Sequence, residues 1–297
     1  MRNIVEALPS IRPPFLTLAP LCTLLGLAFC HYQGIELNIL HAVFAMIGAL
    51  FAAIAVNTIN EYQDIESGLD LLTVRTPFSG GSGLLKDKPE LINTVKRMAL
   101  FSVGIVLLIG IYFVMYVPLL IIPIGVIGLL IVTLYTRFLN KRPWLCFIAP
   151  GLGFGILMPL GAYVTQTSSF SVQLLLITLI PFLIANCLLL INQFPDIDAD
   201  RKIGRNHLSI RYGVHTAILV FAVSILASIA ILMWLVFTHQ LPYSALFCLV
   251  PVGLCLASLI YLVRLKDNIA EHLPAMGLVA ASANLTPLSL SLILFFS

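Results

Sequence analysis

The chain has 297 residues, of which 60% are hydrophobic and 10% are charged. A soluble globular protein carries about 45–50% apolar and about 25% charged residues, so this composition excludes a water-soluble enzyme, a disordered chain and a small disulfide scaffold. The net charge of +3 is small and no long basic run occurs, which excludes a nucleic-acid-binding protein. The composition therefore predicts a protein that crosses a membrane several times.

Nine stretches are apolar and long enough to cross a bilayer, which takes about 20 residues per helix. They lie near residues 14–32, 38–59, 95–115, 118–136, 145–165, 170–192, 214–237, 243–263 and 274–296. The first stretch follows a basic N-terminus, as in a signal peptide, but because eight more spans follow we expect it to be retained. The sequence thus predicts an all-α membrane protein with nine transmembrane helices, forming a single domain over residues 1–297.

Basic residues set the orientation of these spans. All 16 Lys and Arg lie in alternate inter-helix segments, and the other segments carry none of them and only one acid, Glu36. By the positive-inside rule, the N-terminus is cytoplasmic and the C-terminus lies outside. Most of the acidic residues lie in two of the basic segments, 61–97 and 193–213. We expect these two cytoplasmic loops to cap the functional site.

The second span leads directly into a first acidic cluster. If its helix continues to residue 64, positions i, i+3, i+4 and i+7 share one face, and this face carries Asn57, Asn60, Glu61 and Asp64. Gly68 can then turn the chain, so that Asp70 folds back toward the same point. The spacing predicts a polar, acid-rich end to this helix.

The sixth span ends in a second cluster. Asn192, Asp196 and Asp200 follow one another at intervals of four residues, which predicts one stripe on a helix kinked at Pro195. The two clusters match at an offset of 132 residues, Asn60-x-Tyr62-x-Asp64-Ile-Glu66 against Asn192-x-Phe194-x-Asp196-Ile-Asp198. We interpret the match as an internal duplication, two four-helix repeats plus one helix, in which each repeat contributes one acidic helix end to a shared site.

Two acidic faces that converge near a low-dielectric bilayer repel each other unless a cation lies between them. Mg²⁺ suits such a site, because it binds one or two carboxylates and completes its shell with water and phosphate oxygens. The expected metal ligands are Glu61, Asp64, Asp70, Asp196 and Asp200. Nearby basic residues suit a diphosphate, and an apolar bundle suits a lipid tail. The plainer alternative is two solvated helix ends whose acids and bases pair at the membrane surface.

The first cluster resembles the Asn-Asp-x-x-Asp-x-x-x-Asp motif of the UbiA superfamily of membrane prenyltransferases. The run of Asn60, Glu61, Tyr62 and Asp64, followed by a Gly and an Asp, is similar to the variant in the dihydroxynaphthoate branch of menaquinone synthesis. The second cluster, with Gly204-x-Asn206 after it, resembles that branch's second motif. The resemblance implies Mg²⁺-dependent transfer of a polyprenyl group from its diphosphate to an aromatic acceptor, in a bacterial inner membrane with the site facing the cytoplasm.

The resemblance also implies roles for individual residues. Those expected to act in catalysis are Asn60, Asp64, Asp196 and Asp200, and those expected to bind substrate are Asn57, Tyr62, Arg75, Tyr135, Lys141, Asn192, Arg201, Lys202 and Arg205. Tyr62 could instead anchor the chain at the interface, and Arg75 and Lys141 could be ordinary positive-inside charges. His207 is either an acceptor-binding residue or a solvated loop histidine.

Three departures from the family pattern leave the acceptor open. Glu61 replaces the usual Asp and has a longer reach, the stretch 75–83 is not the usual linker of the dihydroxynaphthoate branch, and His207 replaces a common Thr. Other acceptors of the superfamily are 4-hydroxybenzoate, homogentisate, haem and a glycerol phosphate. A different class of function is a divalent-cation or anion transporter, although transporters usually place such acids near the bilayer midplane.

Overall fold

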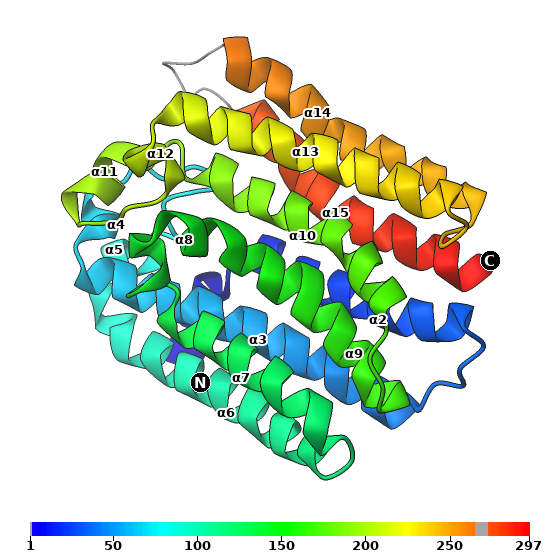
Figure 1. Cartoon of the computed structure of the whole chain (residues 1–297). Helices are drawn as coiled ribbons and strands as arrows, with labels where there is room; N and C mark the ends of the chain where they lie inside the picture. The colour runs from blue at the N-terminus through cyan, green and yellow to red at the C-terminus, as the bar shows by residue number, and fades with distance from the viewer. Residues whose placement is uncertain (1, 265–272) are drawn as a thin grey trace.

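The structure is a computed structural model that describes residues 2–264 and 273–297. Within these residues every regular element is helical, and the long helices pack side by side in one bundle (Figure 1). In chain order these are α2 (Leu18–Tyr32), α3 (Ile39–Glu66), α6 (Ile92–Val114), α7 (Pro118–Leu134), α8 (Pro143–Pro150) joined to α9 (Met158–Thr167), α10 (Val172–Asn192), α13 (Val214–Phe237), α14 (Leu249–Arg264) and α15 (Leu273–Phe296).

Eight helices of the described residues are long and apolar enough to cross a membrane, and they coincide with eight of the nine predicted spans. The remaining prediction, residues 118–136, falls on α7, which is apolar but shorter, with 17 residues. The protein is therefore an integral membrane protein with an all-helical fold. The helix of the second span continues beyond residue 59 to Glu66, as the spacing of its polar residues predicts.

The span over α8 and α9 contains a π-helical turn, Gly151–Leu157. Here the backbone lies against α10, and Asn186 of α10 accepts a hydrogen bond from the Gly151 amide at 2.7 Å. A Cβ atom at Gly151 would lie 2.3 Å from the Asn186 side-chain oxygen, and one at Gly155 would lie 2.4 Å from the Phe182 backbone. Only glycine allows this close approach, so the two glycines let the fifth span pack tightly on the sixth.

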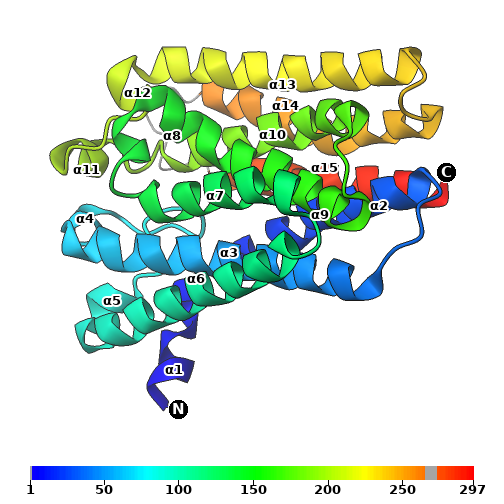
Figure 2. The ribbon, with the colours of Figure 1, turned by 60° about the horizontal axis from the view of Figure 1, so that its bottom comes forward.

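The short helices that follow the two acidic clusters gather at the same end of the bundle. They are α4 (Leu69–Leu72), α5 (Leu84–Asp87), α11 (Ile197–Lys202) and α12 (Leu208–Arg211). They lie at the left in both views, and the C-terminus lies at the opposite end (Figures 1 and 2). The loops 61–97 and 193–213 thus form one cap, at the ends of α3 and α10.

The second cluster does not form the kinked helix that its spacing predicts. The helix α10 ends at Asn192, the chain turns through residues 193–196, and α11 begins at Ile197. Pro195 explains the difference, because a proline disfavours the helical conformation of the residue before it and cannot donate a backbone hydrogen bond. The predicted single stripe of Asn192, Asp196 and Asp200 is therefore wrong, although all three side chains reach the same cavity.

Candidate active site

A cavity of about 870 Å³ connects the cap with the interior of the bundle. Its inner part is apolar and lies between α3, α6, α7, α9 and α10. On α3 the lining side chains are small, with Ala45, Gly48, Ala49 and Ala52 one turn or less apart, and this leaves space between the helices. The cavity is thus an apolar chamber with a polar mouth at the cap.

Of the residues predicted from sequence to form the site, nine line this cavity: Asn57, Asn60, Asp64, Asp70, Tyr135, Asn192, Asp196, Asp200 and Arg205. They come from both acidic clusters, so the structure brings the two clusters to one place. Six others are absent from its lining: Glu61, Tyr62, Arg75, Lys141, Arg201 and Lys202.

The first cluster reaches the cavity from an unbroken helix and the turn after it. Asn60 and Asp64 are one turn apart on α3, and the Asn60 side-chain oxygen accepts a hydrogen bond from the Thr136 hydroxyl. Gly68 adopts a left-handed conformation with φ of 78°, which ends α3 and starts α4. Asp70 then points back into the cavity, as predicted.

Arg205 joins the two clusters. Its guanidinium forms an ion pair with Asp64 of the first cluster and another, at 3.0 Å, with Asp200 of the second. Burial opposes the charge of Arg205, but the neighbouring carboxylates of Asp64 and Asp200 raise its pKa above the ordinary arginine value. This bridge holds the end of α3 and the segment after α10 together across the mouth of the cavity.

His207 is buried in the same network. Its side chain is 1% exposed, and its Nε2 lies 3.1 Å from Asp200 Oδ2, while its Nδ1 is buried without a partner. The interpretation of His207 as a solvated loop histidine is therefore wrong. The residue lines the cavity beside the second cluster.

Several oxygen atoms at the mouth are buried without a hydrogen-bond donor. They are Asp70 Oδ2, Asp196 Oδ1, Asn192 Oδ1 and Asn140 Oδ1. Burial raises the pKa of Asp70 to about 7, with the charges of Asp64 and Glu61 adding to the shift, and burial and the charge of Asp200 do the same for Asp196. Unpaired buried acceptors are costly, so this mouth is suited to a positively charged ligand.

These oxygens fit a hard divalent cation such as Mg²⁺. In the described residues no three His, Cys, Asp or Glu side chains stand close enough together to hold a metal ion by themselves. Mg²⁺ does not need such a cage, because it is commonly bound by one or two carboxylates together with water and substrate phosphate oxygens. The donor set at the mouth consists of such oxygens from both clusters.

The predicted cations outside the cavity are solvent-exposed side chains of the cap (Arg75, Arg201 and Lys202) and of the loop after α7 (Lys141). Arg201 lies 3.7 Å from Asp198, which is also exposed. Tyr62 packs on a small apolar cluster that includes Val95 of α6, and the ammonium of Lys96 lies 5.5 Å from the centre of the Tyr62 ring. These five side chains lie around the site, not in it.

Arg12 and Asn140 also line the cavity, although neither is among the residues predicted from the sequence. Arg12 enters the mouth from the N-terminal segment, and its only signal in the sequence is the pair Arg12-Pro13 before the first span. Asn140 precedes Lys141 in the chain, and its backbone oxygen accepts a 3.0 Å hydrogen bond from the backbone amide of Asn206, which ties the loop after α7 to the second cluster. Contacts of this kind join segments far apart in the chain.

The sequence of this chain is similar to that of one family of membrane proteins over most of its length. The sequence profile described as the UbiA prenyltransferase family matches residues 19–273. The chain is 29% identical over 216 residues to a 1,4-dihydroxy-2-naphthoate octaprenyltransferase of Bacillus subtilis, covering 72% of this chain and 68% of the relative. It is 30% identical over 214 residues to the protein of the same name from Escherichia coli, covering 69% of this chain and 68% of that one.

Solved structures share the fold at low sequence identity. A digeranylgeranylglyceryl phosphate synthase superimposes with a TM-score of 0.68 at 16% identity, with 100% of both chains covered. A UbiA homologue from Archaeoglobus fulgidus bound to DMAPP and Mg²⁺ superimposes with a TM-score of 0.63 at 17% identity, covering 96% of this chain and 99% of that chain.

Proposed function

Because the chain belongs to the UbiA prenyltransferase family and is a membrane prenyltransferase, we propose that it transfers a polyprenyl group from polyprenyl diphosphate to 1,4-dihydroxy-2-naphthoate. The observation that carries the proposal is a single cavity in which acidic groups of both clusters meet at the mouth of an apolar chamber. A diphosphate with a long hydrocarbon tail has the same division into a charged and an apolar part.

Mg²⁺ would be held by Asp64, Asp70, Asp196 and Asp200, and when bound it would offset the negative charge that develops on the diphosphate leaving group. Asn60 and Asn192 would orient these carboxylates, or their side-chain oxygens would accept hydrogen bonds from water bound to the metal. Arg205 would donate hydrogen bonds to the phosphate oxygens, since its guanidinium already lies between the two clusters. Asn57 and Tyr135 complete the polar wall.

The apolar chamber would bind the prenyl chain and keep water from its reactive carbon. When the bond between the allylic C1 and the diphosphate oxygen breaks, the carbon becomes cation-like and would react with water if water were present. A carbon of the electron-rich ring then forms a bond to C1. In the dihydroxynaphthoate reaction the ring carboxyl group leaves as CO₂, and diphosphate is the second product.

The topology follows the same proposal. We place nine helices across the membrane, counting the shorter α7, with the N-terminus in the cytoplasm and the C-terminus outside. The cap formed by residues 61–97 and 193–213 then faces the cytoplasm of a bacterial cell, where a soluble aromatic acid and a charged diphosphate can both reach the mouth. Basic residues of the cap (Arg75, Arg201 and Lys202) and of the loop after α7 (Lys141) would attract these anions and orient the protein.

Product analysis tests the proposal. Membranes containing the protein would be incubated with octaprenyl diphosphate, Mg²⁺ and one candidate acceptor at a time, and the lipid products identified by mass. The proposal expects a product only with 1,4-dihydroxy-2-naphthoate, with loss of CO₂, and none when Mg²⁺ is removed by a chelator. A product formed only with 4-hydroxybenzoate or homogentisate would contradict the proposed acceptor. Ion uptake by proteoliposomes in the absence of prenyl transfer would contradict the assignment as an enzyme.

A further inference from the structure

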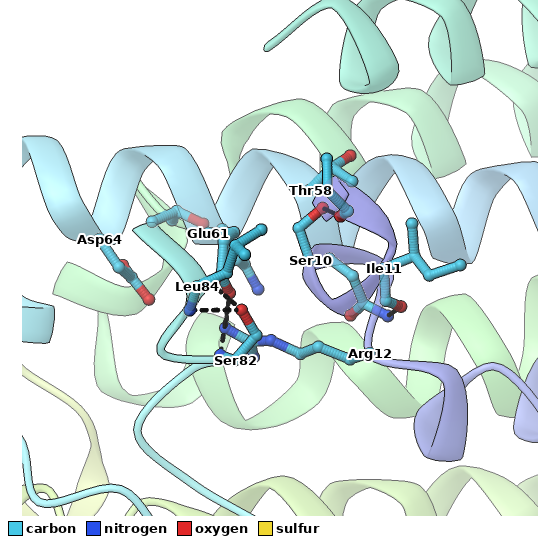
Figure 3. A network of polar contacts seen from close by, with 12 residues as sticks. Ser10, Ile11, Arg12, Thr58, Glu61, Asp64, Ser82 and Leu84 are labelled. Carbon is cyan, nitrogen blue, oxygen red and sulfur yellow. Dashed lines mark hydrogen bonds and ion pairs between the residues drawn. The ribbon is translucent and has the colours of Figure 1, made fainter. Parts of the chain in front are cut away.

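Glu61 holds a loop of the cap and the N-terminal segment in place. In the sequence it belongs to the acidic face of the first cluster, but in the structure its carboxylate is fully buried and both of its oxygens accept hydrogen bonds. Oε2 accepts one from the Ser82 amide at 3.1 Å and pairs with Arg12 at 3.2 Å, and Oε1 accepts one from the Ser82 hydroxyl. Figure 3 shows Ser82 and Arg12 converging on Glu61, one turn before Asp64 on α3.

Ser82 belongs to a glycine-rich loop, residues 76–83, which forms part of the cavity wall. Pro77 to Gly81 line the cavity, and Gly80, Gly81 and Gly83 all have left-handed backbones with φ of 75°, 70° and 75°. A Cβ atom at Gly81 would lie 3.1 Å from Asp70 Oδ1. The loop backbone therefore runs directly against one of the acids of the mouth.

Arg12 is the second part that Glu61 holds. It has a left-handed backbone, φ 51°, between the 3₁₀ turns η1 (Leu8–Ile11) and η2 (Pro13–Phe15). That conformation is unfavourable for a residue with a side chain, so it is kept by surrounding contacts. The Asn57 amide donates a 2.9 Å hydrogen bond to the Ile11 carbonyl, and Glu61 pairs with the guanidinium. Together these contacts fasten the N-terminal segment to α3.

Two departures from the family pattern thus contact each other. Glu61 replaces an aspartate, and residues 75–83 differ from the usual linker. The extra methylene of glutamate carries its carboxylate to Ser82 in that linker. A coordinated change of this kind is expected where a longer side chain has acquired a partner, whereas a metal ligand would keep its oxygens free for the ion.

We propose that Glu61 is a positioning residue and not a metal ligand: it anchors the loop 76–83 and Arg12 so that the loop backbone closes the mouth beside Asp70. The inference rests on the proposed function for what the mouth binds. The metal ligands of this chain would then be the aspartates alone.

Two measurements, metal binding and the hydrogen exchange of residues 76–83, distinguish a metal ligand from a positioning residue. Full-length protein in nanodiscs would be titrated with Mn²⁺ in the presence of inorganic diphosphate and followed by electron paramagnetic resonance, for the parent and for E61Q, E61D and S82A. D64N serves as the variant of an expected ligand, and E66Q as a matched control on the next turn of α3, where Glu66 pairs with Lys96 outside the cavity. Hydrogen exchange of residues 76–83 is measured on the same samples.

We expect E61Q, E61D and S82A to keep Mn²⁺ affinity within about threefold of the parent, while D64N loses more than about tenfold. Exchange of the loop should rise by about tenfold in each of the three variants, because one buried hydrogen-bonded contact is worth about 1.4 kcal/mol. In the double variant E61Q/S82A the loop should exchange no more than about twofold faster than in S82A, since both changes remove the same contact.

The prenyl transfer assay gives a second readout. E61Q, E61D and S82A should each raise the KM for octaprenyl diphosphate and leave the dependence of the rate on Mg²⁺ concentration unchanged.

Loss of Mn²⁺ affinity in E61Q that equals the loss in D64N would overturn the inference, as would loop exchange equal to that of E66Q. If D64N binds Mn²⁺ like the parent, the proposed metal site fails instead, and loop exchange alone then decides the role of Glu61.

Discussion

The two acidic clusters match in sequence but differ in backbone structure. The first lies on α3, which continues unbroken through Glu66, and the second lies beyond the end of α10, on a turn and the short helix α11. The difference maps to one aligned position, where the first cluster has Gln63 and the second has Pro195. Gln63 continues the helix, and its carbonyl accepts a hydrogen bond from the Ser67 amide at 3.0 Å.

This comparison shows that the side chains at the cavity do not depend on a shared backbone. The helical cluster supplies Asp64 directly, and Asp70 after a glycine turn. The broken cluster supplies Asp196 from the turn and Asp200 from α11. Arg205, which follows the broken cluster, reaches back to Asp64 of the helical one. We expect the two clusters to share one ligand, and the predictions below test how equally they contribute.

The largest effect is expected from neutralising one acid in each cluster. Asp64→Asn and Asp200→Asn each remove a charge that faces the proposed Mg²⁺–diphosphate complex, and each should lower kcat by about a thousandfold, as losses of electrostatic stabilisation at a reacting centre do. The transfer assay in membranes measures kcat of each variant, with expression and folding checked by gel filtration. A near-parental rate in either variant would show that its cluster does not contact the reacting group.

Arg205→Met should have the next largest effect. The change removes the bridge between the clusters and leaves two carboxylates facing each other, and breaking a buried ion pair in this way costs about 3 kcal/mol. We expect a lower midpoint of thermal unfolding and a KM for the prenyl diphosphate raised by about tenfold or more. Arg205→Lys should recover only part of the loss, because an ammonium group cannot reach both partners as a planar guanidinium does. Full recovery with lysine would contradict the bridging role.

Smaller effects are expected at the glycine turns that follow each cluster. Gly68 and Gly204 have φ of 78° and 81°, and a Cβ atom at either would meet no neighbour within 4 Å, so Gly68→Ala and Gly204→Ala add backbone strain of about 1–2 kcal/mol without a clash. We expect each substitution to reduce activity severalfold. Gly68→Ala would do so by displacing Asp70, and Gly204→Ala by displacing Arg205. The control is Gly104→Ala within α6, where an alanine also meets no neighbour and suits the helix. Equal activity of all three variants would show that the turns do not position Asp70 and Arg205.

Much of this architecture is predictable from local sequence patterns. Apolar length locates the spans, and the spacing of polar residues predicts that α3 continues to Asp64 and that Gly68 turns the chain. These features depend on helix geometry and on the conformational freedom of glycine, which act over a few residues.

Other features depend on contacts between distant segments, and local sequence patterns do not predict them. The burial of His207 requires the partner Asp200 and the packing of α12, and Glu61 is occupied by Ser82 and Arg12, which lie 21 and 49 residues away. Four basic residues that were predicted to bind substrate, Arg75, Lys141, Arg201 and Lys202, are exposed, because the positive-inside rule alone places charge at that membrane surface. Sequence alone does not distinguish an orienting charge from one that binds substrate.

The central claim is that both clusters bind one metal–diphosphate complex. Mn²⁺ bound to the purified protein together with a non-cleavable prenyl thiodiphosphate should show magnetic coupling to ³¹P, which requires the metal and the phosphate to be in direct contact. We expect Asp70→Asn in one cluster and Asp196→Asn in the other each to weaken Mn²⁺ binding by about tenfold or more. Coupling to ³¹P that depends on one cluster and is unchanged by substitution in the other would contradict the claim.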